Sequence, residues 1–172
     1  MGRTYIRAQF KPINSEYSRN LARKRQSIIR GSLNKLFVDG YPPVPKIRDK
    51  IEQWTGCSIF ELSEHLRRGP FVTMLDFRVK ESWHLDHVFP VSLIPDSEIY
   101  LAHYYKNLEA LPPSINMYKS NMRPMNEHTK QRFQTWQEFV EWIDRDPTEL
   151  RRKWKKTVYN HTPLRIHKQR RW

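Results

Sequence analysis

The residues of this chain that could do chemistry together are concentrated in the stretch WHLDHVFP, residues 83–90. This stretch places His84 and His87 on either side of Asp86. A carboxylate offers a hard oxygen ligand for a metal ion, and an adjacent imidazole offers a base whose pKa lies near neutrality. If Asp86 holds a metal, His87 can stand beside it and deprotonate a water molecule. This is the chemistry of metal-assisted hydrolysis.

Two asparagines and a lysine follow downstream. Asn107 lies twenty positions after His87, Asn116 lies nine positions further on, and Lys119 follows three positions later. Consecutive residues of a regular strand point to opposite faces, so Asp86 and His87 could serve one site only if the backbone bends there. The proline three positions after His87 is compatible with such a bend.

This ordered pattern resembles the HNH endonuclease family, in the variant whose last histidine is replaced by asparagine. The resemblance is carried by three phrases, WHLDHVFPVS, HYYKNLEALP and INMYKSNM, which are each similar to a local pattern of the family and occur in the family's order. The preceding GCSIFELSEHL is also similar to the segment before the motif in many phage-encoded members, a group that includes homing endonucleases. The resemblance covers residues 54–123 of the chain.

The resemblance implies a fold and a set of roles. The family fold is the ββα-metal finger, a two-stranded hairpin packed on one helix around one divalent metal ion. Asp86 and Asn116 are then the metal ligands. His87 is the general base that activates water, and Asn107 holds the hairpin loop and orients His87. Oxygen ligands favour Mg²⁺ or Mn²⁺, and asparagine in place of histidine weakens the case for Zn²⁺. The implied function is metal-dependent cleavage or nicking of double-stranded DNA.

Other interpretations of these residues stay open. Asp86, His87 and the two asparagines could be turn and capping residues, because Asp and Asn favour turns. His84 shares a strand face with Asp86 and could contact phosphate or metal, or it could be an exposed strand residue. Lys119, on the same helix face as Asn116, could neutralise a phosphate or simply be solvated. The rival function is a non-catalytic nucleic-acid-binding protein with a nuclease-like core.

The charge of the chain is strongly positive and unevenly placed. Of the net +13, residues 1–35 contribute +8 and residues 148–172 contribute +8, whereas residues 36–147 carry −3. Basic ends of this kind favour a polyanion, and the narrow apolar faces of the basic helices argue against a membrane surface. We therefore expect double-stranded DNA as the partner. The candidate phosphate contacts are the basic residues of two predicted helices, Arg23, Lys24, Arg25, Arg151, Arg152, Lys153, Lys155 and Lys156.

The elements that must position these residues are short. Ser58 and Glu61 form a capping-box signature, which predicts a helix over 58–68. Residues 16–37 predict a helix that is interrupted at Gly31-Ser32. The remaining predictions are a proline-rich linker at 39–46, an extended stretch at 82–94, a short strand and then a helix around Pro112-Pro113 with Ser114 as a possible N-cap, and helices at 135–143 and 149–158.

Together these elements predict an α+β protein with a small ββα-metal core, flanking helices and basic arms. The expected regions are a basic helical DNA-binding arm at 1–38, a nuclease core at 39–127 with its motif at 83–121, and C-terminal helices with a basic tail at 128–172. The chain has one cysteine, Cys57, so no disulfide can form within it. Without a signal-peptide pattern or a long apolar run, we expect a cytoplasmic protein of a bacterial host cell, associated with the nucleoid if it is phage-encoded.

Overall fold

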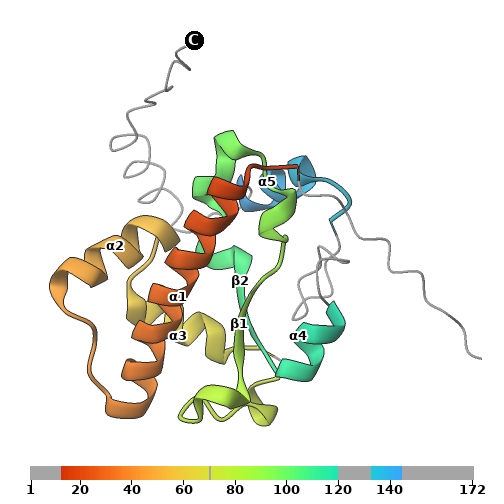
Figure 1. The fold of residues 1–172 in the computed structure, drawn as a ribbon. Coiled ribbons are helices and arrows are strands. Elements are labelled where there is room, and N and C mark those ends of the chain that lie inside the picture. The colour runs from red at the N-terminus through yellow and green to blue at the C-terminus, as the bar shows by residue number, and fades with distance from the viewer. Residues whose placement is uncertain (1–12, 70, 120–132, 145–172) are drawn as a thin grey trace, which may run out of the picture.

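The computed structural model describes residues 13–69, 71–119 and 133–144. It consists mainly of helices around one small antiparallel hairpin, which is consistent with the expected α+β class. The elements in chain order are α1 (Glu16–Asp39), α2 (Pro45–Thr55), α3 (Ile59–Arg67), β1 (His84–His87), β2 (Leu108–Leu111), α4 (Pro113–Lys119) and α5 (Trp136–Asp144), with short 3₁₀ turns between them (Figure 1).

The first helix, α1, is uninterrupted over its whole length. It ends at Asp39 and is capped by Gly40, whose φ of +72° lies in the left-handed region that favours glycine. The predicted break at Gly31-Ser32 is wrong, because glycine inside a helix costs only about 1 kcal/mol. The complete burial of Ile29 and Leu33 on either side of that glycine outweighs this cost.

Two short helices follow α1 and pack on each other. The predicted linker at 39–46 ends at Pro45, which starts α2, a helix that the sequence analysis did not predict. Proline suits the first helical position, where its missing N–H is not needed. The prediction of α3 is confirmed, since the Ser58 hydroxyl accepts from the Glu61 N–H at 3.2 Å and the Glu61 carboxylate accepts from the Ser58 N–H at 2.7 Å.

The hairpin is shorter than the predicted extended stretch. β1 pairs antiparallel with β2 in a register that sets His84 opposite Leu111 and Asp86 opposite Glu109. Beyond His87 the chain leaves the sheet and passes through 3₁₀ turns before it returns as β2. The part of 82–94 outside β1 is therefore mostly turn rather than strand.

The predictions for the helices after the hairpin are partly confirmed. A strand followed by a helix is found as predicted, but α4 begins at Pro113, so Ser114 lies inside the first turn and is not the N-cap. Proline at the first helical position again explains the early start. The helix predicted at 135–143 is α5, which buries Phe139. The helix predicted at 149–158 lies outside the described residues.

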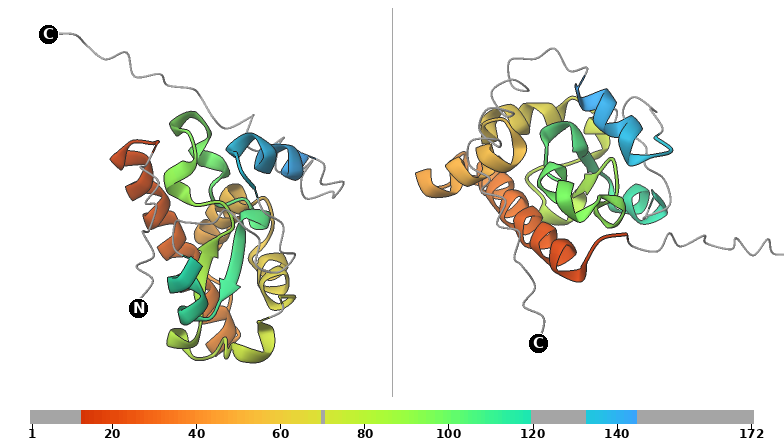
Figure 2. Two further views of the ribbon diagram at one scale, coloured as in Figure 1. Left: turned by 90° about the vertical axis from the view of Figure 1, so that its right-hand side faces the viewer. Right: turned by 90° about the horizontal axis from the view of Figure 1, so that it is seen from above.

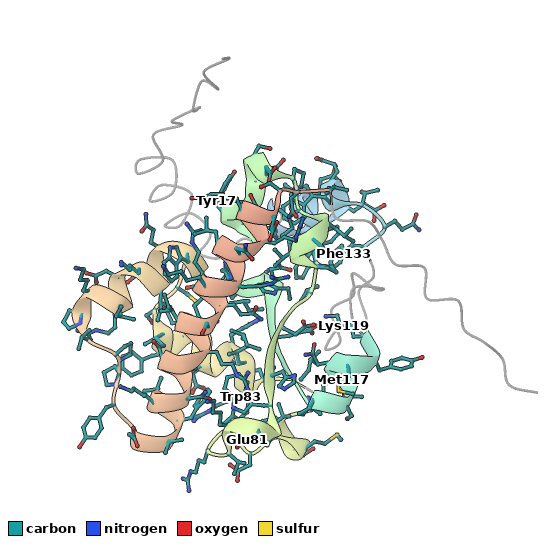
Figure 3. All side chains as sticks on the ribbon, viewed as in Figure 1. Tyr17, Glu81, Trp83, Met117, Lys119 and Phe133 are labelled. Atoms are coloured by element: carbon teal, nitrogen blue, oxygen red, sulfur yellow. The ribbon has the colours of Figure 1, made fainter. Side chains whose placement is uncertain are left out.

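The hairpin lies among the helices, with α1 on one side and α4 on the other in Figure 1, and the view from above in Figure 2 again shows the red α1 and the teal α4 on different sides of the green hairpin. Trp83, labelled in Figure 3, is completely buried directly before β1. Its ring contacts Phe37 of α1 and Phe77, with ring centroids 5.7 and 5.4 Å away. α1 therefore belongs to the common core, whereas the division of the chain into three regions stays a prediction.

Two further expectations concern the membrane and the cysteine. Within the described ranges, no helix combines the length and the apolar character that crossing a bilayer requires. Cys57 is free and buried, and as the chain's one cysteine it has no disulfide partner within the chain, as predicted. Burial raises the pKa of its thiol to about 12, so the thiol stays protonated and unreactive at neutral pH.

Candidate active site

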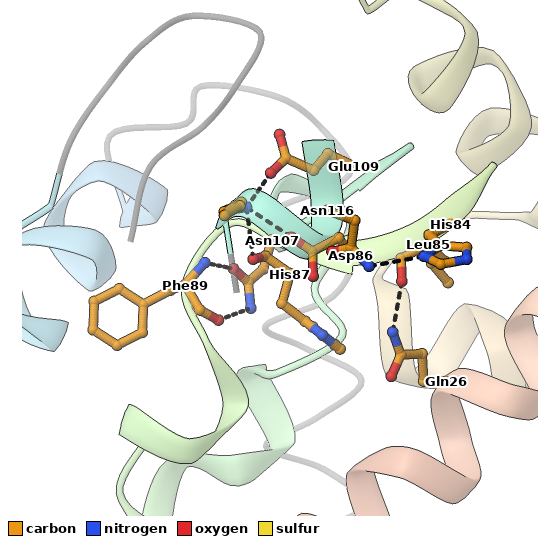
Figure 4. Close-up of polar contacts among 10 residues, drawn as sticks. Gln26, His84, Leu85, Asp86, His87, Phe89, Asn107, Glu109 and Asn116 are labelled. Atoms are coloured by element: carbon orange, nitrogen blue, oxygen red, sulfur yellow. Dashed lines mark hydrogen bonds and ion pairs between the residues drawn. The ribbon is translucent and has the colours of Figure 1, made fainter. Parts of the chain in front are cut away.

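The candidate site is the face of β1 that α4 contacts (Figure 4). Side chains along β1 alternate between half-buried and buried, so His84 and Asp86 share one face while Leu85 and His87 share the other. α4 brings Asn116 and Lys119 to the His84 and Asp86 face. The Asn116 amide Nδ2 contacts Nδ1 of His84 at 2.9 Å, and the Lys119 ammonium donates to Oδ2 of Asp86 at 2.8 Å.

Lys119 is a deeply buried charge of the site. Only 1% of the residue is exposed, and its ammonium donates to Asp86, to the backbone oxygen of His87 at 3.0 Å and to the carboxylate of Glu109. Burial alone would lower the pKa of Lys119, but the charges of Asp86 and Glu109 together raise it above its ordinary value. Both interpretations of Lys119 are therefore wrong, because a buried ammonium that donates to three acceptors is not solvated and has no N–H left for a phosphate.

Glu109 is a member of this cluster that the sequence analysis did not single out. It is completely buried on β2, directly opposite Asp86 in the hairpin register. The pairing of the two strands could have identified Glu109, since a carboxylate that faces Asp86 across a hairpin needs a cation between the two. The Lys119 ammonium supplies that cation.

His84 lies at the edge of the cluster and is half-buried. Burial and the nearby charge of Arg30 lower the pKa of His84, and the carboxylate of Asp86 opposes that shift. Its contact with Asn116 leaves Oδ1 of that amide as the atom that could bind a cation. Both interpretations of His84, a contact to metal or phosphate and an exposed strand residue, remain compatible with this position.

The imidazole of His87 points to the other face of β1. It is 6% exposed and packs against His103, with the two ring centroids 5.1 Å apart. Burial, together with the charge of Lys119, lowers the pKa of His87 to about 3, so the ring is neutral at pH 7. Its Nε2 is buried without a hydrogen-bond partner among the described residues. The structure thus groups His84, Asp86, Asn116 and Lys119, and it does not turn the ring of His87 toward them.

Asn107 closes the long connection between the two strands. Its side-chain oxygen accepts from the backbone N–H of Phe89 at 2.7 Å, and its side-chain nitrogen donates to the backbone oxygen of Ala102 at 2.8 Å. Its own backbone oxygen accepts from the N–H of Val88 at 3.0 Å. These buried bonds hold the chain directly after His87, and that is the loop-holding part of the role that the resemblance implies for Asn107.

The donor atoms of this face suit a hard cation. In the described part of the chain, no three His, Cys, Asp or Glu side chains converge as a metal site. A metal here would be held by Asp86 and Asn116, with water and phosphate oxygens completing its shell. Mg²⁺ is commonly bound in this way, through one or two carboxylates and several waters. The Lys119 ammonium already binds Oδ2 of Asp86, so a metal ion here would share that carboxylate with an ammonium.

The basic residues predicted to bind phosphate differ in their surroundings. Arg23 and Lys24 are exposed on α1, and Arg23 lines a pocket next to His84. The guanidinium of Arg25 lies over the ring of Trp54, 5.2 Å from its centroid, and is half-buried. The predicted contacts that lie outside the described residues are Arg151, Arg152, Lys153, Lys155 and Lys156.

The buried imidazoles of His87 and His103 should make the folded protein less stable in acid. His87 has a folded-state pKa of about 3 against 6.5 when unfolded, so below pH 6.5 the unfolded chain binds the proton that the folded chain rejects. We expect the free energy of unfolding to fall by about 1.4 kcal/mol per pH unit from this group as the pH drops below about 6. Burial also lowers the pKa of His103, which adds to the slope.

Urea unfolding between pH 6.5 and 5 measures this slope. His87→Gln should flatten the slope of the unfolding free energy against pH. His84→Gln changes a half-buried histidine and should leave most of that slope in place. An unchanged slope in His87→Gln would show that the buried imidazole does not resist protonation.

Comparisons with protein-family models, with curated proteins and with solved structures found no match. The assignment of the site therefore rests on its own residues and geometry, and the resemblance to the HNH endonucleases is not tested by any relative.

Proposed function

We propose that this protein is a metal-dependent endonuclease of the HNH type that hydrolyses phosphodiester bonds in double-stranded DNA. One observation carries the proposal. The hairpin and the helix that follows it bring Asp86 and Asn116 to one face, and Asn107 ties the loop between the strands. The strand, loop, strand and helix follow each other in the order that the resemblance implies.

In this proposal Asp86 and Asn116 hold one Mg²⁺ or Mn²⁺ ion through side-chain oxygens. The ion supplies positive charge beside the scissile phosphate and its leaving oxygen. Lys119 and Glu109 keep the Asp86 carboxylate in place, since the ammonium binds both carboxylates. The site thus combines a fixed carboxylate with an amide oxygen from a neighbouring helix.

His87 is the proposed general base. It accepts a proton from water at Nε2 while the water oxygen bonds to phosphorus and the bond from phosphorus to the 3′-oxygen breaks. The ring is neutral at pH 7, as a base must be before it accepts a proton, but a pKa of about 3 makes it a weak base, and this counts in favour of the second candidate below. The unpartnered Nε2 supports this role, because a buried nitrogen without a partner among the described residues can accept from a water molecule.

The second candidate is a non-catalytic nucleic-acid-binding protein with the same core. It is favoured by the position of the Lys119 ammonium, which already neutralises Asp86, and by the burial of the His87 ring on the opposite face. This candidate predicts binding to DNA without cleavage under any metal condition.

Plasmid cleavage with Mg²⁺ or Mn²⁺ separates the two candidates. The wild type should convert supercoiled plasmid to nicked or linear forms, and EDTA should abolish the reaction. His87→Ala should lose cleavage and keep DNA binding, with His84→Ala as the matched variant on the other face of β1. Absence of cleavage by the wild type would support the binding protein. Cleavage retained in His87→Ala and lost in His84→Ala would overturn the assignment of the base.

A further inference from the structure

A pocket of about 500 Å³ opens beside the candidate site, between α1 and β1. His84 and Asn116 belong both to the site and to the wall of this pocket. The opposite wall comes from α1, and Lys80 from the turn before β1 completes the rim. A ligand in the pocket would therefore lie in direct continuity with Asp86 and Asn116.

The wall of the pocket is basic and polar. It includes Arg23, Arg30 and Lys80, and the described residues that line it include no aspartate or glutamate. Gln26 and Asn34 add side-chain amides. Three cations around a space of this size, without an acid among the described lining residues, leave an excess of positive charge that suits an anion.

Arg30 is held in position by the protein itself. Its Nη2 donates to the backbone oxygens of Lys80 at 3.0 Å and of Trp83 at 3.1 Å. The guanidinium lies over the indole ring of Trp83, 5.8 Å from its centroid. A fixed arginine loses little freedom when an anion binds beside it.

We propose that this pocket binds a backbone phosphate of the nucleic acid, held by Arg23, Arg30 and Lys80. The inference rests on the proposed function for the position of the scissile bond, and it extends that function by giving the path of the strand. The strand runs from α1 across His84 and Asn116 to Asp86. Cations of this kind fix the register of a nucleic acid without reading its bases.

The test is the salt dependence of binding to a fluorescent DNA duplex, measured by anisotropy in EDTA so that no cleavage takes place. Arg23→Gln and Lys80→Gln should each reduce the slope of log K against log salt by about one, because each removes one phosphate contact. Both side chains are exposed, so neither change should unfold the protein. The matched control is Lys50→Gln, which removes an exposed charge of α2 that does not line the pocket.

A loss of slope in Arg23→Gln and Lys80→Gln, without an equal loss in Lys50→Gln, supports the pocket. Equal effects in all three variants would overturn it, because the charges would then act without a defined site. Unchanged DNA slopes with weakened binding to phosphatidylserine vesicles would also overturn it, in favour of a membrane surface. Because the assay needs no metal, a selective loss of slope in a protein that never cleaves plasmid would reject the endonuclease and keep the phosphate pocket.

Discussion

Replacing Lys119 by methionine is expected to lower the free energy of unfolding by about 3–5 kcal/mol. The ammonium is the cation between Asp86 and Glu109, and both Lys119 and Glu109 are almost completely buried. Methionine fills a similar volume but leaves the two carboxylates without that cation. An uncompensated buried charge is among the most costly single changes in a protein. Urea unfolding at pH 7 measures the loss.

Lys35→Met is the matched control, because Lys35 is exposed on α1, and it should change stability by less than about 0.5 kcal/mol. The double variant Lys119→Met with Glu109→Gln should recover part of the loss, since it removes one of the two charges. A loss below about 1 kcal/mol in Lys119→Met would mean that the buried ion pair does not hold the hairpin to α4.

Asp86→Asn is expected to reduce plasmid cleavage by at least about a hundredfold at saturating DNA. The change keeps the shape of the side chain but removes the charge that holds the proposed metal ion. Glu109 still neutralises Lys119 in this variant, so the fold should remain. DNA binding should be unchanged or slightly tighter, because the variant lacks one negative charge that would repel the DNA phosphate.

The control for this second prediction is Asp49→Asn, which removes an exposed carboxylate of α2, away from the hairpin. It should cleave like the wild type. Cleavage by Asp86→Asn within about threefold of the wild-type rate would place the reaction elsewhere on the protein.

The parts of the fold that the sequence predicted are those with local signals. The capping box of Ser58 and Glu61 marks the start of α3 through bonds between residues three positions apart. The apolar spacing of α5 repeats at helical intervals, so Phe139 could be assigned to the core in advance. Such patterns depend on neighbouring residues only, and a single sequence contains them.

The wrong predictions concern places where packing between distant segments decides the structure. Gly31 looks like a break, yet α1 continues through it because Ile29 and Leu33 are buried against elements far along the chain. The prolines at 42–45 look like a linker, yet the last of them starts α2. In both places tertiary contacts and position within the turn outweigh the residue preference that the sequence displays.

The sequence indicated which residues belong to the candidate site, but it did not indicate which of them contact each other. The order of Asp86, Asn107 and Asn116 pointed to this region, and the structure brings Asp86 and Asn116 to one face. Alternation along β1 turns His87 away from that face, and the backbone bend that Asp86 and His87 would need to serve one site is not formed within the strand. The burial of Lys119 follows from the hairpin register that sets Glu109 opposite Asp86, and no local pattern encodes that register.

The most direct test of the central claim is a titration of the protein with Mn²⁺ in the absence of DNA, followed by electron paramagnetic resonance. The account predicts one bound ion in the wild type and an affinity at least about tenfold weaker in both Asp86→Asn and Asn116→Ala. Equal Mn²⁺ binding in the wild type and both variants, or no binding in any of them, would contradict the claim that these two side chains share one cation.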